Sequence, residues 1–144
     1  MDVREINQAG MELIKSFESC SLQPYKDSRG MWTIGYGHTL GVTGDYPNIT
    51  QEQADALLRQ DLAAAEGHVL HFITAELDDN QFAAIVSLTY NCGTAPLLGT
   101  LGQDLNDGYY DDAAAQILRW DHCNGQVVEG LTRRRKAEYD LFNT

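Results

Sequence analysis

The chain has 144 residues, of which 43% are hydrophobic and 22% are charged, a composition typical of one soluble globular domain with an ordinary core. Its formal net charge of −11 argues against nucleic acid as a partner, because phosphate binding needs clustered Lys and Arg. No segment approaches the roughly 18 apolar residues that span a membrane, and the polar start MDVREINQAG lacks the apolar stretch of a secretory signal. We therefore expect neither stable membrane insertion nor a secretory signal.

A short helix is predicted first, because apolar residues recur at helical spacing from Ile6 to Phe17. Glu18 then lies at the C-terminal end of this helix, partly sheltered by its apolar face. Strand-forming residues interrupted by Pro and Gly follow. They predict a small antiparallel sheet, with Asp27 in the turn KDSRG and Thr33 in the next strand. One carboxylate is thus expected in an apolar setting and the other in a wet one.

The rest of the chain has helical patterns, and two of them begin with recognisable caps. Thr50 with Gln53, and Asp78 with Gln81, have the spacing of a capping box, and Gly93 is suited to end the second of these helices. The signals predict a long helix over about 50–72 and another from 78 to 93. Shorter helices are predicted at Pro96–Asn106, at Ala113–Trp120 with Asp111 as its cap, and after Thr132, which would cap the last one.

These elements predict an α+β fold within a single domain over residues 1–144. The β-containing lobe would cover about 17–50 and a long connecting helix about 50–72. A mainly helical lobe would cover about 73–144 and include the N-terminal helix. Because binding sites favour such junctions, we expect a cleft between the lobes.

Glu18 and Asp27 suit the cleavage of a glycosidic bond. This reaction needs an acid that protonates the leaving oxygen and a second carboxylate that faces the sugar from the other side. Contrasting environments, one apolar and one hydrogen-bonded, favour that division of labour. Taken singly, each residue has an ordinary explanation: Glu18 as a solvated helix-end charge, Asp27 as a turn residue, and Thr33 as a strand former.

At these residues the sequence resembles the phage-type lysozymes, or endolysins, of glycoside hydrolase family 24. Members have a Glu after a short helix, an Asp nine positions later and a Thr six beyond that, which begins the segment T-I-G-x-G-H. Glu18, Asp27 and Thr33 have these spacings, and the segment 33–38 reads TIGYGH. The resemblance continues through LDDNQFAAIVSLTYNCG at 77–93 and GLTRRRKAEYDLF at 130–142, and so covers nearly the whole chain.

The resemblance implies a lysozyme-like fold and the activity of a muramidase. Such an enzyme hydrolyses the β-1,4 bond between N-acetylmuramic acid and N-acetylglucosamine in bacterial peptidoglycan, which lyses the host cell. The resemblance also implies an inverting reaction, in which Glu18 is the general acid and Asp27 the general base. Thr33 would orient the attacking water or hold the Asp27 carboxylate by its hydroxyl.

Looser matches concern the helical lobe. Tyr90 and Asn91 occupy positions that line the cleft in related lysozymes, where Tyr90 would stack on a sugar and Asn91 would bond to an N-acetyl group. Core packing for Tyr90 and a helix-end cap for Asn91 explain them equally well. Arg119, which precedes Trp120, resembles part of the family's paired Arg-Trp and is a third candidate for substrate binding.

Two structural roles are also implied by the resemblance. His38 and Asp61 occupy positions that form an ion pair between the sheet lobe and the long helix in related lysozymes. The alternative is an ordinary residue of the β lobe and a solvated helix charge. The run at 133–135, three arginines, fits either binding of the wall's peptide carboxylates or structural salt bridges, and we favour the structural role.

Cys20, Cys92 and Cys123 are odd in number and lack CxxC spacing, which argues against a zinc site or a disulfide framework. We expect buried structural thiols. The alternative is a single disulfide bond that forms after the protein is released from the cytoplasm. We expect no cofactor and no metal.

The expected partner is the glycan strand of peptidoglycan, and we expect a monomer. An endolysin without a secretory signal would accumulate in the host cytoplasm until a holin releases it to the periplasm and cell wall. The net charge of −11 departs from the basic character of many wall-degrading enzymes. Two other functions stay open: a lytic transglycosylase, which uses the sugar's own hydroxyl in place of water, and an inactive glycan-binding module. The presence of both Asp27 and Thr33 argues against a transglycosylase. The complete set of Glu18, Asp27 and Thr33 argues against an inactive module.

Overall fold

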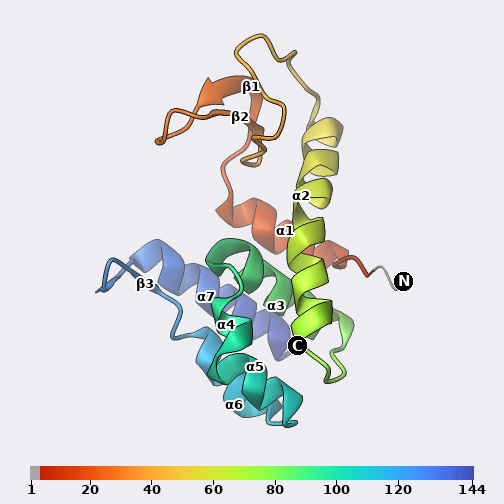
Figure 1. Ribbon diagram of the computed structural model, residues 1–144, viewed down its shortest axis with the longest axis vertical. Coiled ribbons are helices and arrows are strands. Elements are labelled where there is room, and N and C mark those ends of the chain that lie inside the picture. Colours follow the sequence, from red (N-terminus) through yellow and green to blue (C-terminus); the bar gives the residue numbers. More distant parts are fainter. Residues whose placement is uncertain (1–3) are drawn as a thin grey trace. The chain divides into compact units, whose positions relative to one another are not determined.

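The computed structural model describes residues 4–144, and over this range the chain combines helices with two small antiparallel strand pairs (Figure 1). The predicted α+β class is confirmed. By their internal contacts, the described residues divide into two compact units, residues 14–63 and residues 4–13 with 64–144. The helices are α1 (Gln8–Phe17), α2 (Gln51–Phe72), α3 (Asp79–Cys92), α4 (Ala95–Leu98), α5 (Thr100–Asn106), α6 (Tyr110–Ile117) and α7 (Glu129–Phe142). The strands are β1 (Ser21–Lys26), β2 (Trp32–Gly35), β3 (His122–Cys123) and β4 (Gln126–Val127).

Strands β1 and β2 form the antiparallel sheet of the first unit. After β2 the chain turns back at once, because Ile34 and His38 exchange both backbone N–H···O bonds at 2.9 Å. This return uses left-handed φ angles of +65° at Gly35 and +96° at Gly37, which residues with a side chain rarely adopt. The two glycines of TIGYGH therefore place His38 beside the strand.

Helix α2 begins at the predicted capping box, which is confirmed. Gln53 donates its backbone N–H to the Thr50 hydroxyl at 3.1 Å, and Thr50 donates its own N–H to Gln53 Oε1 at 2.8 Å. Within the first unit, the buried side of α2 carries Ala54, Leu58 and Leu62. Their spacing of four residues places them on one helical face, which packs into the core of this unit.

Helix α3 lies in the core of the second unit. Every residue from Phe82 to Thr89 is buried, as expected for a helix enclosed by protein on all sides, and α7 packs against it. Both predicted ends are confirmed. Asp78 and Gln81 form a reciprocal capping box, and Gly93 ends the helix with a φ of +77°.

Three predicted helices have wrong bounds. The segment 96–106 forms parts of two helices, because Gly99 is extended (φ −103°, ψ −152°) between α4 and α5. Helix α6 spans Tyr110–Ile117, so it ends before the predicted Trp120, and Asp111 lies in its first turn and does not cap it. Helix α7 begins at Glu129, and Thr132 lies inside it, where its hydroxyl donates to the Val128 carbonyl at 3.2 Å. Residue types that cap helices also suit the first turn, where an acidic charge or a local hydrogen bond is favourable.

Strands β3 and β4 form a hairpin in the second unit that the apolar pattern does not predict. The turn between them is Asn124–Gly125, with φ angles of +53° and +78°. An Asn-Gly dipeptide is a strong signal for a two-residue hairpin turn. However, each strand has only two residues, all of them exposed, so the alternation that marks a half-buried strand is missing.

The three cysteines differ in exposure. Cys20 and Cys123 are exposed and Cys92 is partly buried, and all three are free thiols. The prediction of buried thiols is therefore wrong for the first two, which lie beside β1 and in the exposed hairpin strand β3.

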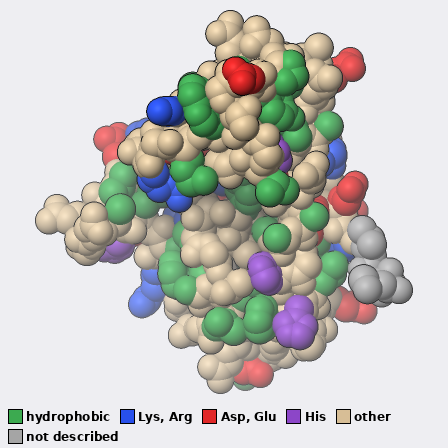
Figure 2. Space-filling model, turned by 45° about the horizontal axis from the view of Figure 1, so that its top comes forward, with side chains coloured by type: hydrophobic (Ala, Val, Ile, Leu, Met, Phe, Trp, Pro, Cys, Tyr) green, Lys and Arg blue, Asp and Glu red, His purple; other side chains and the backbone are tan. Residues whose placement is uncertain are grey.

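Within residues 4–144, no helix combines the length and the apolar character needed to cross a membrane. Figure 2 shows the Asp and Glu side chains of one face in separate groups and not in a single patch.

Two glycines give opposite predictions for the same substitution. A Cβ at Gly10 in α1 would lie 2.7 Å from the Cβ of Ala83 in α3, whereas a Cβ at Gly67 in α2 would meet nothing within 4 Å. We expect Gly10→Ala to lower the free energy of unfolding by about 1–3 kcal/mol through overpacking. We expect Gly67→Ala to raise it by about 0.5–1 kcal/mol, because alanine loses less backbone entropy in a helix. Urea unfolding of both variants measures the difference, and equal effects would contradict the packing of α1 on α3.

Candidate active site

Glu18 is the first residue after helix α1, and it belongs to the first unit. Its backbone N–H donates to the Ile14 carbonyl at 3.0 Å, which completes the last turn of the helix. The residue is half-buried. The amphipathic pattern of α1, which buries Met11 and Ile14, thus brings a carboxyl group to the helix end in the semi-sheltered setting expected from the sequence.

Asp27 lies between β1 and the turn that leads to β2, and its carboxylate is held by the backbone of that turn. Oδ1 accepts hydrogen bonds from the Met31 N–H at 2.9 Å and from the Arg29 N–H at 2.8 Å, while Oδ2 lies 3.4 Å from Arg29 Nη2. The Met31 amide, together with Arg29, holds the pKa of Asp27 below its ordinary value. The side chain is 21% exposed. Asp27 is therefore an ionised carboxylate with Oδ1 fully engaged and Oδ2 available to a water molecule.

Thr33 is in β2, opposite Tyr25 of β1, and is only 2% exposed. Its hydroxyl donates to the Met31 carbonyl at 2.9 Å. Met31 therefore bonds to both candidate residues, through its N–H to Asp27 and through its carbonyl to Thr33. Because the Thr33 proton is used in this way, the hydroxyl oxygen is left to accept a hydrogen bond, and an orienting bond from Thr33 to the Asp27 carboxylate is not formed.

His38 and Asp61 lie in contact within the first unit. His38 Nδ1 is 2.9 Å and 3.0 Å from the two carboxylate oxygens of Asp61. The His38 side chain is 5% exposed and that of Asp61 is 24% exposed. The glycine-dependent turn after β2 carries His38, and α2 carries Asp61, so this contact ties the turn to the helix.

Removing His38 should destabilise the fold, because Asp61 would keep its partial burial without its partner. We expect His38→Asn to lower the free energy of unfolding by about 1–3 kcal/mol. The matched control is His68→Asn, at an exposed position of α2, the helix that contains Asp61, which should change stability by less than about 0.5 kcal/mol. Both variants are measured by chemical unfolding at pH 6, and an equal small effect at the two positions would show that the contact contributes nothing.

Tyr90, Asn91 and Arg119 belong to the second unit. Tyr90 is half-buried and Asn91 is exposed near the C-terminal end of α3. Asn91 Oδ1 accepts a hydrogen bond from Arg135 Nη2 at 2.8 Å, so its NH₂ group is the part left for a ligand. Arg119 is exposed in the turn after α6, and no hydrogen bond or ion pair of its side chain is found among residues 4–144.

Arg135 is the centre of a buried cluster that holds the end of α3 against α7. It donates to the Cys92 thiol and to the Trp120 carbonyl, and its Nε lies 2.7 Å from Glu138 Oε1. Burial raises the pKa of Glu138, while Arg135 and the hydroxyl of Ser87 act in the opposite direction. The favoured structural role of the arginine run fits Arg135, whereas the first arginine of the run is exposed and pairs with Glu129 on the helix surface.

Three contributors to these sites were not singled out from the sequence. Arg29 and the Met31 amide hold Asp27, and Glu138 pairs with Arg135. A signal existed for each. An Asp at the start of a turn commonly accepts bonds from backbone N–H groups ahead of it, and Glu138 follows Arg135 by three residues, which places both on one helical face.

A protein-family model described as "Phage lysozyme" matches residues 15–138. An endolysin of Acyrthosiphon pisum secondary endosymbiont phage 1 is 41% identical over 145 residues, which cover 96% of this chain and 98% of that protein. An endolysin of Bacillus phage PZA is 39% identical over 97% of this chain, but the chain spans only 55% of its length. The similarity thus extends over the candidate residues from Glu18 to Arg119.

Solved structures show the same fold. A variant of P22 lysozyme aligns with a TM-score of 0.89 and 33% identity, over 98% of this chain and 99% of that chain. The muramidase domain of SpmX from Asticaccaulis excentricus aligns with a TM-score of 0.86 and 38% identity, over the same shares. The predicted lysozyme-like architecture is confirmed by these neighbours.

Proposed function

The chain belongs to the phage lysozyme family, and from this membership we propose that it hydrolyses the β-1,4 bond between N-acetylmuramic acid and N-acetylglucosamine in bacterial peptidoglycan. Family membership implies a glycosidase-type hydrolase. The observation that carries the finer proposal is the arrangement around Met31, which pairs an ionised, accessible Asp27 carboxylate with a buried Thr33 hydroxyl. Names of similar proteins, endolysin and muramidase domain, support the same substrate.

In the proposed reaction Glu18 is the general acid. Its proton passes to the glycosidic oxygen as the bond from that oxygen to the anomeric carbon breaks. A water molecule that donates hydrogen bonds to Asp27 Oδ2 and to the Thr33 hydroxyl oxygen attacks the anomeric carbon from the opposite face. Asp27 takes the proton that this water releases. The products are a new reducing end and a free hydroxyl. Asp27 then loses its proton to solvent, and solvent restores the proton on Glu18.

Attack on the face opposite to the leaving group inverts the anomeric carbon. We therefore expect the product released from the β-linked glycan to be the α anomer. Proton NMR of a fresh digest, recorded before mutarotation, distinguishes the two anomers. A β product at the earliest times would rule out Asp27 as the base for water and favour a covalent route.

We also propose an oligomeric state, a location and a set of sugar-binding residues for the chain. The chain would act as a monomer on peptidoglycan glycan strands, without a cofactor, after accumulating in the host cytoplasm and being released by a holin. Tyr90, Asn91 and Arg119 are the proposed binding groups for the sugar units. The free NH₂ of Asn91, held in place through Arg135, is suited to an N-acetyl carbonyl.

A further inference from the structure

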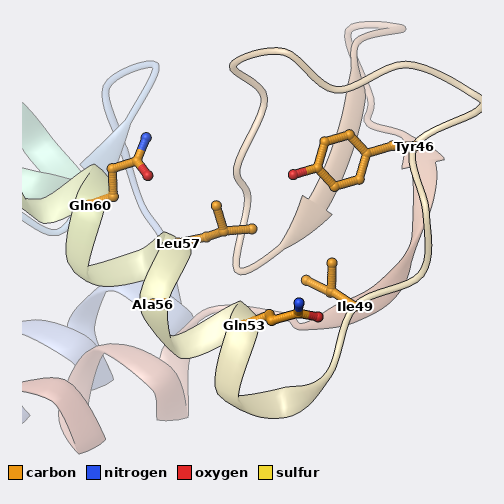
Figure 3. A pocket seen from close by; sticks show the side chains of 6 residues that line it. All are labelled: Tyr46, Ile49, Gln53, Ala56, Leu57 and Gln60. Carbon is orange, nitrogen blue, oxygen red and sulfur yellow. The ribbon is translucent and has the colours of Figure 1, made fainter.

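A groove in the first unit lies between the loop before α2 and one face of that helix. It has a volume of about 240 Å³, and none of Glu18, Asp27 and Thr33 lines it. Its lining residues are Tyr46, Ile49, Gln53, Ala56, Leu57 and Gln60. Figure 3 shows the Tyr46 ring across the hollow from Leu57, with its hydroxyl directed towards α2.

The face of α2 that forms one side of this groove is recessed because of its sequence. Gln53, Ala56, Leu57 and Gln60 lie at positions i, i+3, i+4 and i+7 of α2, so they share one face. The small side chain of Ala56 at the middle of this face leaves the space open. Leu57 supplies an apolar floor, and the two glutamines stand at its ends.

The opposite wall is anchored and so preformed. A Cβ at Gly44 would lie 2.9 Å from Trp32 Cζ2, so the loop backbone packs directly on the indole ring of β2. The Tyr46 N–H donates to the Thr43 carbonyl at 3.0 Å, and the Ile49 N–H donates to the Leu22 carbonyl at 2.9 Å. A wall held by its neighbours loses little entropy when a ligand binds.

The chemistry of the lining is polar but uncharged. Among residues 4–144, no hydrogen-bond partner is found for the Tyr46 hydroxyl or for the Gln60 amide, and Gln53 uses only its Oε1 in the helix cap. The groove therefore offers one hydroxyl, one complete amide and one NH₂ group around an apolar centre. Since no cation lines it, a carboxylate or phosphate ligand would not be neutralised there.

We propose that this groove binds one N-acetylglucosamine unit of a glycan strand, separately from the unit at the cleaved bond. A neutral sugar has an apolar face for the Tyr46 ring and hydroxyls for the glutamines, and its acetyl methyl fits the floor at Leu57. N-acetylmuramic acid, with its acidic or peptide-bearing substituent, fits less well. Pockets for drug-sized ligands have volumes of roughly 300–1,000 Å³, so the smaller groove, of about 240 Å³, suits a single sugar ring. The inference rests on the proposed function, which supplies the glycan.

A second point of attachment would hold a polymeric substrate on the enzyme between cleavage events. Binding at one site raises the effective concentration of the same strand at the other, provided that the strand can reach both. A short oligosaccharide that fills only one site gains nothing. The groove should therefore affect turnover of long strands selectively.

The test is a titration of chitotetraose, a β-1,4 oligomer of N-acetylglucosamine, into the ¹⁵N-labelled Glu18→Gln chain. We expect saturable shifts of the side-chain amide resonances of Gln53 and Gln60. Ala56→Leu fills the hollow and should abolish them, whereas Ala64→Leu, the same change at another exposed position of α2, should not. Gln60→Ala, an exposed helix change, should weaken binding about 2- to 10-fold. Absent shifts, or shifts that persist in Ala56→Leu, would overturn the proposal.

The second measurement compares rates on whole cell walls and on short soluble glycan fragments. Ala56→Leu should slow wall digestion about 2- to 10-fold, the loss expected from one aromatic contact, and leave the short fragments unaffected. Equal slowing on both substrates would overturn the role of the groove. Because the titration does not depend on turnover, sugar binding in the groove combined with an unsubstituted chain that cleaves no wall would contradict the proposed function and not the groove.

Discussion

Glu18→Gln is expected to lower hydrolysis of peptidoglycan by about 10²- to 10⁴-fold, because glutamine keeps the shape of the side chain but cannot donate a proton to the leaving oxygen. Glu18 follows the last turn of α1, which is closed by its backbone N–H, so the substitution leaves the helix end intact. Release of soluble fragments from purified peptidoglycan measures the rate, and thermal unfolding checks the fold.

The matched control for this experiment is Glu12→Gln, an exposed carboxylate on the same helix. It should leave the rate within about twofold of the original chain, since surface changes away from the site have small effects. Rapid clearing of cell walls by the Glu18→Gln chain would remove Glu18 from the mechanism.

Asp27→Asn is expected to have a comparable effect, about 10²- to 10⁴-fold on the rate. Asparagine can still accept the bonds from the Met31 and Arg29 amides through Oδ1, so the turn should survive, but the group can no longer take a proton from water. The matched control is Asp45→Asn, an exposed aspartate in the loop before α2 of the same unit. Near-normal hydrolysis by Asp27→Asn would show that another group activates the water.

The hydrogen bonds to the Asp27 carboxylate also predict that the stability of the fold depends on pH. The Met31 amide lowers the folded-state pKa of Asp27 below the ordinary value of 3.8 for an aspartate. A carboxyl group with a lowered pKa contributes stability that is present above its unfolded pKa and is lost as the pH falls through the folded value. The difference in unfolding free energy between the original chain and Asp27→Asn should therefore be constant near neutral pH and shrink below pH 3.8. A difference that grows on acidification would contradict the hydrogen bonds found at Oδ1.

Short-range signals predicted the parts of the fold that depend on a few neighbouring residues. The capping boxes at Thr50 and Asp78 and the stop at Gly93 are confirmed, because each is a local set of backbone and side-chain bonds. The turn in TIGYGH is local in the same sense, since it depends on two left-handed glycines. This turn places His38 beside the strand that contains Thr33.

Other features depend on contacts between distant segments, and local patterns could not supply them. The break at Gly99 and the start of α6 at Tyr110 shift the predicted helices by a few residues. The cluster of Arg135, Ser87 and Glu138 joins two helices that are far apart in sequence. Even within the motif, the spacing indicated Thr33 but not the Met31 carbonyl that accepts a hydrogen bond from the Thr33 hydroxyl.

The most direct test of hydrolysis by Glu18 and Asp27 is mass spectrometry of a complete digest of purified peptidoglycan. Hydrolysis adds one water at each cleaved bond, so fragments should end in reducing N-acetylmuramic acid. A lytic transglycosylase would leave 1,6-anhydro ends, which are lighter by one water. We predict reducing ends throughout, lost together with activity in the Asp27→Asn chain. Anhydro ends, or reducing ends on N-acetylglucosamine, would contradict the proposed reaction.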